Sequence, residues 1–204
     1  MKKVLLFITI AASCVFARSA SKTHDGFFLN LSLGMGFQSI DFVVDDYQED
    51  PSKASGSATD LDIKIGGRIM NNLLLHATLA GNTLTTSVNI SDDEEIKTTP
   101  NMSLFGIGAT YYFPENFLAT ASFGVAQFHA NENVTTFYAS VASRAGNDIN
   151  TGLGFQIGGG KEWWIANEWG IGATASILYG FASNKSDANE SSFAISLRLS
   201  VTYN

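Results

Sequence analysis

The sequence predicts an all-β fold: an eight-stranded antiparallel up-and-down transmembrane β-barrel with short periplasmic turns and long extracellular loops. Three observations predict it. Apolar residues alternate with other residues in eight segments, the connections are sorted into short and long ones, and glycine is abundant, with 19 copies in 204 residues. Only 15% of the residues are charged, against about 25% in an ordinary soluble protein.

The eight predicted strands share one pattern. Apolar side chains occupy every second position, and small or polar residues lie between them. This period predicts strands with one apolar face. The segments are 27–38, 60–65, 73–80, 105–111, 117–125, 153–157, 169–179 and 193–204. Their even number suits an antiparallel barrel that closes on itself.

The connections between these segments alternate in length. Three are tight, at Asn71–Asn72, Pro114–Asn116 and Asn167–Glu168. Four are long and polar, at 43–57, 89–99, 129–150 and 183–191, and within the third the segment 134–141 can extend the flanking strands as a hairpin. Short turns at one end and long loops at the other are typical of bacterial outer-membrane barrels.

The non-apolar face decides between a membrane barrel and a soluble one, because both have period two. In a soluble barrel that face meets water and carries many Lys and Glu residues. Here it carries small residues: Gly34, Gly36, Gly106, Gly108, Ser122, Gly124, Gly152, Gly154, Gly158, Gly170, Gly172 and Ser176. Small residues suit a narrow lumen, so the bulky aliphatic side chains are expected to face lipid.

Aromatic residues cluster beside the short turns. The predicted girdle consists of Tyr111, Phe113, Phe117, Trp163, Trp169 and Tyr203. Aromatic rings of this kind lie at the headgroup level of a membrane. A thinner second girdle is expected near the long loops.

The N-terminus has the features of an export signal. Lys2 and Lys3 precede an apolar stretch at 4–16. With cleavage after Ser19, the small residues Ala17 and Ser19 occupy the third and the last position before the cleavage site. We expect a signal peptide at 1–19 and a barrel at 26–204, with cleavage after Ala17 as an alternative. Lipidation at Cys14, the only cysteine, and retention as a helical anchor are further alternatives.

Two motifs resemble known outer-membrane proteins. Val201 and Tyr203 resemble the C-terminal assembly signal of Gram-negative outer-membrane proteins, although Asn204 follows the aromatic residue and Arg198 stands where glycine is common. The run 159–164, a short turn and 169–172 are similar to the sixth-to-seventh-strand hairpin of small outer-membrane barrels. Along its mature length the chain resembles the OmpA and OmpX type of eight-stranded barrel, which implies the outer membrane of a Gram-negative bacterium and biogenesis by its barrel-assembly machinery.

A few charged residues fall on the predicted lumen face: Lys64, Arg68, His76, Glu162 and Arg198. Counted from the tight turns, the last four are expected at similar depth. A charge in a narrow interior is costly unless it is paired. We therefore predict that Glu162 pairs with Arg198 or Arg68, within either a polar plug or a gated ion path.

The sequence offers no enzyme motif that fits its context. Gly158–Lys161 is not a phosphate loop, because Glu162 follows the lysine and the segment is a predicted strand. His76 is expected at the turn end, His129 has no evident Ser or Asp partners, and His24 lies just before the barrel. We predict no catalysis, no cofactor and no metal site.

Two functions remain open at this stage. The first is a structural or surface-interaction barrel that displays its loops for adhesion or envelope integrity. The second is a small channel or transporter for a small or hydrophobic ligand. The bulky lumen residues Phe28, Leu74, Leu104, Tyr112 and Leu178 argue against a wide pore.

The expected partners follow from the predicted location and from charge. They are outer-membrane lipid and lipopolysaccharide, and an extracellular surface partner is possible through the acidic loops, which include 92–95. Those acidic residues can bridge divalent cations or simply keep the loops solvated. Nucleic acid is excluded by the net charge of −7.

Overall fold

The computed structural model describes residues 23–24, 26–42, 52–85, 88–89, 97–132, 150–183 and 189–204. The predicted signal peptide at 1–19 and the predicted hairpin at 134–141 lie outside these residues. No helix among the described residues is long and apolar enough to span a bilayer.

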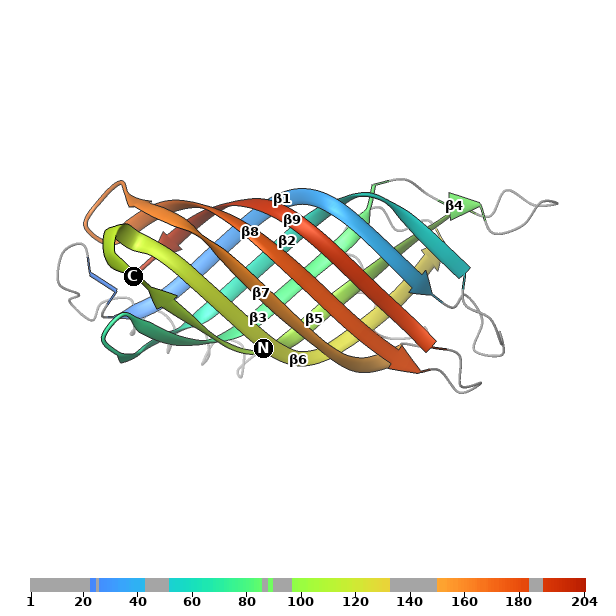
Figure 1. Ribbon diagram of the computed structural model, residues 1–204, viewed down its shortest axis with the longest axis horizontal. Helices are drawn as coiled ribbons and strands as arrows, with labels where there is room; N and C mark the ends of the chain where they lie inside the picture. The colour runs from blue at the N-terminus through green and yellow to red at the C-terminus, as the bar shows by residue number, and fades with distance from the viewer. Residues whose placement is uncertain are drawn as a thin grey trace, which may run out of the picture.

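The described chain is almost entirely β-strand (Figure 1). The strands are β1 (Phe27–Phe42), β2 (Ser52–Met70), β3 (Leu73–Leu84), β4 (Val88–Asn89), β5 (Lys97–Tyr112), β6 (Phe117–Glu132), β7 (Asn150–Trp164), β8 (Trp169–Ser183) and β9 (Asn189–Tyr203). Each long strand pairs antiparallel with its neighbours, β1 pairs with β9, and β3 pairs with β5. The eight long strands of the described chain therefore form a closed barrel, and the predicted fold class is confirmed.

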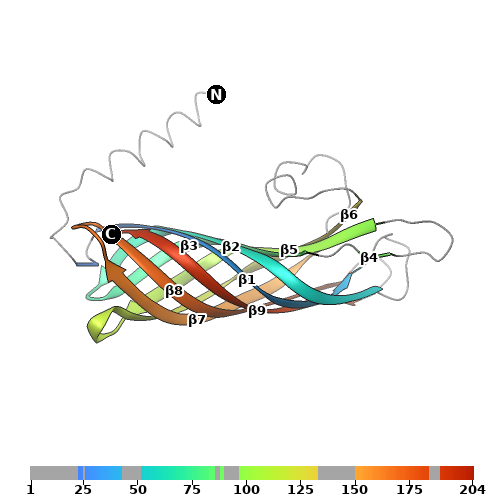
Figure 2. The same cartoon turned by 90° about the horizontal axis from the view of Figure 1, so that it is seen from above.

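The barrel has two different ends. The connections 71–72, 113–116 and 165–168 lie at one end, which we call the turn end, and the C-terminus lies there as well (Figures 1 and 2). The other end, which we call the loop end, receives the long connections. At the turn end Asn72, Glu115 and Asn116 have positive φ angles, which tight turns need and which asparagine tolerates better than most residues.

The strand pairing is staggered around the barrel. The row of paired residues that starts at Glu162 on β7 runs through Gly172, Ser200, Ser32, Asp62, Ala80, Leu104 and Ala126 and returns to β7 at Gly152. The offset is 162 − 152 = 10 residues. Stagger and strand tilt are linked in a closed barrel. Two residues that lie the same number of positions from a tight turn therefore need not lie at the same depth in the bore.

The two faces of the wall have opposite character. Bulky apolar side chains point outward: Leu197 is 70% exposed and Leu31 is 48% exposed. Their neighbours along the strands, such as Ser196 and Ser32, are buried inside. Water-soluble barrels have the reverse arrangement, so this exterior suits a hydrocarbon environment. The predicted orientation of the faces is confirmed.

Glycines bring the strands and the bore-filling side chains close together. A Cβ atom at Gly106 would meet the backbone of Phe123 and Gly124 on β6, and one at Gly124 would meet the backbone of Phe105 and Gly106. The glycine-rich face therefore allows a narrow bore to be filled by side chains.

Several strands are longer than predicted. β2 begins at Ser52, inside the predicted first loop, and β7 extends over 150–164 where only 153–157 was predicted. The short strand β4, which pairs with β5, was not predicted. Residues 52–57 of β2 are almost all Ser, Ala or Gly, so this part of the strand forms ladder hydrogen bonds without a hydrophobic period in the sequence.

Candidate functional site

Four charged residues meet near the middle of the bore. Asp60, Asp62 and Lys64 alternate along β2 and therefore share its inner face, while Arg198 projects from β9. All four residues are at least 95% buried. Lys64 Nζ donates to Asp62 Oδ2 at 2.5 Å, and Arg198 Nη2 donates to Asp60 Oδ2 at 2.9 Å. Arg198 also pairs with Asp62 through Nη1. We call these four residues the charge cluster.

Neighbouring polar groups add hydrogen bonds to the charge cluster. Asn82 on β3 donates to Asp60 Oδ2 at 2.8 Å, and Ser196 on β9 donates to the same oxygen at 2.6 Å. Two anions and two cations balance, so the cluster as a whole is neutral. Buried charges persist in a protein interior when they are paired and hydrogen-bonded in this way.

The predicted pairing of Glu162 with Arg198 or Arg68 is wrong. Tyr112 donates to Glu162 Oε2 at 3.1 Å, and Asn204 Nδ2 donates to Oε1 at 3.4 Å. Arg198 instead lies in the row that contains Gly34 and Asp60. On strand β8, Arg198 pairs with Thr174, and Thr174 pairs with Gly160 on β7. The row of Arg198 therefore reaches β7 at Gly160 and not at Glu162.

Arg68 does not lie among the buried lumen residues. It is exposed at the turn end, beside a β-bulge between positions 68 and 70 of β2. Because water reaches the rim of the barrel, the guanidinium can be solvated there and needs no buried partner. The structure therefore groups Lys64 with Arg198, places His76 and Glu162 in separate buried sites, and leaves Arg68 outside.

His76 on β3 lies in a network of hydroxyl groups. Its Nδ1 is 3.0 Å from Thr78 Oγ1 and its Nε2 is 3.0 Å from Thr110 Oγ1. Thr110 in turn donates to Thr120 at 3.0 Å. Both ring nitrogens thus have hydroxyl partners. These hydrogen bonds fix the orientation of the imidazole ring.

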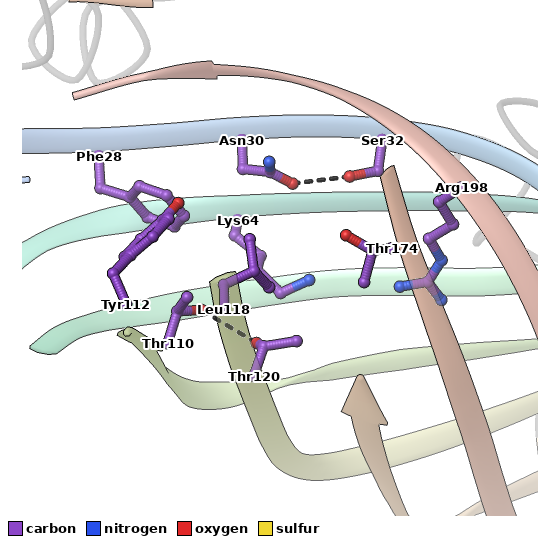
Figure 3. A pocket seen from close by; sticks show the side chains of 10 residues that line it. All are labelled: Phe28, Asn30, Ser32, Lys64, Thr110, Tyr112, Leu118, Thr120, Thr174 and Arg198. Carbon is purple, nitrogen blue, oxygen red and sulfur yellow. Dashed lines mark hydrogen bonds between the residues drawn. The ribbon is translucent and has the colours of Figure 1, made fainter. Parts of the chain in front are cut away.

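A polar cavity lies on the turn-end side of the charge cluster (Figure 3). Lys64, Arg198 and Asn30 line it together with hydroxyl groups of Ser32, Thr110, Thr120 and Thr174. Phe28 and Tyr112 lie together at one end of the cavity, and Arg198 lies at the other (Figure 3). The cavity is thus a space inside the bore with both polar and apolar side chains in its lining.

Apolar side chains fill the bore on both sides of the charge cluster. Phe28, Leu74 and Tyr112 form a layer at the turn end, against which Leu118 packs. The layer toward the loop end is larger and includes Ile40, Ala54, Ala58, Ala80, Leu84, Met102, Leu104, Ala126, Phe128, Leu178 and Ala182. The five bulky residues predicted for the lumen are all at least 98% buried. A continuous water path through these layers would require side chains to move.

The residues of the predicted aromatic girdle lie around the turn end. Tyr111, Phe113, Phe117, Trp163 and Trp169 are exposed on the outside of the barrel. Tyr203 is covered instead, because the rings of Trp169 and Phe27 lie 5.2 and 6.3 Å from it, centroid to centroid. Its hydroxyl donates to Glu168 Oε2 at 2.8 Å.

Sequence analysis missed Asp60 and Asp62 as lumen charges. Their signal was available, because they share the alternation Asp60-x-Asp62-x-Lys64 with a residue that was assigned to the lumen. Sequence analysis also did not place His24 in the turn-end mouth, since no strand pattern includes it. Among the described residues, no group of His, Cys, Asp and Glu side chains is arranged to hold a metal ion.

The closed wall, the apolar exterior and the filled bore define a small transmembrane β-barrel of the outer-membrane class. No family model and no curated protein matches the chain. Several solved structures are similar to it in fold.

One of these structures is neisserial surface protein A, at 11% identity, with 86% of this chain and 96% of that chain covered and a TM-score of 0.49. Another is Ail, the attachment invasion locus protein of Yersinia pestis, at 11% identity, 85% and 98% coverage and a TM-score of 0.45. A third is the outer membrane protease OmpT of Escherichia coli, at 10% identity, 93% and 99% coverage and a TM-score of 0.41. A likeness of fold does not by itself identify an activity.

Proposed function

We propose that this protein is an integral outer-membrane barrel whose role is carried by its loops, in surface interaction, adhesion or envelope integrity. The observation that supports this proposal most directly is the filled bore. Two apolar layers enclose the charge cluster, so the barrel suits a rigid wall better than a conduit. A wall of this kind holds long loops at a membrane surface, where variable segments can contact partners.

The orientation follows the usual rule for such barrels. The turn end faces the periplasm, and the loop end faces the outside of a Gram-negative cell. Residues 1–19 direct export and are removed. The exposed aliphatic band, which includes Leu33, Met35 and Leu199, contacts lipid acyl chains, and the turn-end aromatic rings contact headgroups.

The proposed partners are therefore outer-membrane lipid and lipopolysaccharide, the barrel-assembly machinery during biogenesis, and an extracellular surface partner. The acidic residues at 92–95 make divalent cations a natural bridge to phosphate-bearing surfaces. No catalytic role is part of the proposal, which rests on the filled bore and the long loops.

Single-channel recording in planar bilayers distinguishes the wall from a channel. We expect the purified, folded barrel to give no steady conductance, because the apolar layers exclude water from the bore. Folding is checked in the same sample by heat-modifiable gel migration. Steady unitary conductance would contradict the proposal and favour a small channel.

Loop replacement tests the proposed role itself. In a deletion strain, wild-type protein and a variant whose segments 90–96 and 133–149 are replaced by Gly-Ser linkers of equal length are expressed to equal levels. We expect only the wild type to restore surface attachment and detergent resistance. Full restoration of both properties by the barrel with replaced loops would show that the loops do not carry the function.

A further inference from the structure

The residues just before β1 enter the turn-end mouth of the barrel. Gly26 O accepts a hydrogen bond from Arg68 N at 3.2 Å, which holds this segment against the end of β2. Two residues earlier, the side chain of His24 is only 8% exposed, although it precedes the first strand. The side chain of His24 therefore lies against the barrel rather than in solvent.

Inside the mouth the His24 ring lies against two aromatic rings. It stacks on Tyr112 with a centroid separation of 3.4 Å and an interplanar angle of 13°. Its centroid lies 4.9 Å from the Trp164 ring. Its Nε2 is 3.4 Å from Oδ1 of Asn116. These contacts bury the imidazole among side chains of the turn end.

The residues that hold His24 come from the opposite side of the barrel. Tyr112, Asn116 and Trp164 belong to the ends of β5 and β7 and to the turn between β5 and β6. In the closed ring β6 is four strands from β1 in either direction. His24 therefore spans the mouth from the β1 side to the far wall.

A buried carboxylate belongs to the same pocket. Glu162 is 99% buried, and Tyr112, on which His24 stacks, donates a hydrogen bond to it. A Cβ atom at Gly170 would collide with the Glu162 side chain, so this glycine makes room for the carboxylate. Aromatic faces with hydrogen-bonding groups beside them suit a flat nitrogen-containing ring, which can stack on them.

We propose that the turn-end mouth is an aromatic–carboxylate binding site for imidazole-class rings, which His24 fills from within the chain as a plug. Tyr112 and Trp164 supply the ring faces, Glu162 accepts the hydrogen bond of the Tyr112 hydroxyl, and Asn116 contacts a ring nitrogen. The site lies at the end of the barrel away from the loops, so it does not depend on the function proposed for them.

Accessibility of Trp164 to a water-soluble quencher tests the plug. The chain has three tryptophans, so the double variant W163F/W169F leaves Trp164 as the single emitter. In this background we expect H24A to increase acrylamide quenching of Trp164 at least about twofold, because a stacked ring has been removed from its pocket. Asn116→Gly, which keeps the positive φ of that turn position, should change quenching in the same direction by less.

The control variant is N71A, which alters an exposed residue of a different short turn. It should leave Trp164 quenching unchanged. Heat-modifiable migration verifies that each variant is folded. We expect H24A to fold, because His24 lies outside every strand. Equal quenching of Trp164 in wild type and H24A would contradict the proposal that His24 is a plug. An increase in N71A as large as that in H24A would contradict it as well.

Chemical rescue tests the specificity of the site. Free imidazole added to H24A should occupy the vacated pocket and return acrylamide quenching toward the wild-type level, whereas Tris at the same concentration and pH should not. Because imidazole can itself quench, each value is compared with wild-type protein in the same buffer. If acrylamide quenching of Trp164 rises in H24A and imidazole does not lower it again, the site does not recognise the imidazole ring.

Discussion

Arg198 reaches Asp60 across strand β1, through the space that Gly34 leaves open. Gly34 pairs with Asp60 on one side and with Arg198 on the other. A Cβ atom at Gly34 would collide with the Arg198 side chain and with the backbone of Leu197. One glycine therefore permits a salt bridge between two strands that are not neighbours, and this contact ties β2 to β9 inside the bore.

Substitution of Gly34 should destabilise the barrel through this contact. We expect G34A to lower the free energy of unfolding by about 1–3 kcal/mol, the usual cost of overpacking a filled interior. Urea unfolding followed by gel migration measures the change. The control is G56A on β2, where a Cβ atom would meet nothing within 4 Å. Equal stability of G34A and G56A would contradict the role assigned to Gly34.

Removal of Arg198 alone should cost more than removal of Arg198 and Asp60 together. R198M leaves Asp60 buried without a cation, which typically costs about 3–5 kcal/mol. R198M/D60N restores the charge balance, because Lys64 still pairs with Asp62, and should recover most of the lost stability. The same unfolding assay measures both variants, and a double variant no more stable than R198M would contradict the charge balance.

A surface ion pair provides the comparison for the buried one. Lys53 lies 3.8 Å from Asp41, and its side chain is 78% exposed. Because water and salt screen such a pair, K53A should change stability by less than about 1 kcal/mol. A loss in K53A as large as that in R198M would show that burial is not what makes the charge cluster important.

The hydrogen bond between Tyr203 and Glu168 should stabilise the closing strand. Y203F removes the hydroxyl donor but keeps the ring against Trp169. We expect a loss of about 1–2 kcal/mol, since the acceptor is a carboxylate at a partly solvated rim. A double-mutant cycle with E168Q isolates the pair, and strictly additive losses in that cycle would rule the interaction out.

The strands and their outward-facing apolar side chains could be predicted, because side chains of a strand alternate between two faces. Leu31, Phe155 and Leu197 are exposed as that alternation requires. The ends of the strands could not be predicted where the residues are small. Residues 52–57 of β2 carry no hydrophobic period, and their strand conformation rests on backbone pairing with β1.

The partners within the bore could not be predicted because they depend on stagger between strands. Sequence analysis placed Glu162 and Arg198 at one depth, yet their rows differ, and Gly34 directs Arg198 toward β2 instead. Asp60 and Asp62 were missed although the spacing to Lys64 places them on its face. His24 lies outside any periodic segment, so only the folded structure shows its contacts with Tyr112 and Trp164.

The most direct test of the barrel is the oxygen accessibility of spin labels along β9 in lipid bilayers. Single cysteines in a C14S background, at Ile195 and Leu197 on the outer face and at Ala194 and Ser196 on the inner face, report on alternate positions of one strand. We expect high accessibility to molecular oxygen at Ile195 and Leu197 and low accessibility at the other two. Equal accessibility at all four positions, or the reverse pattern, would contradict a wall whose apolar side chains face lipid.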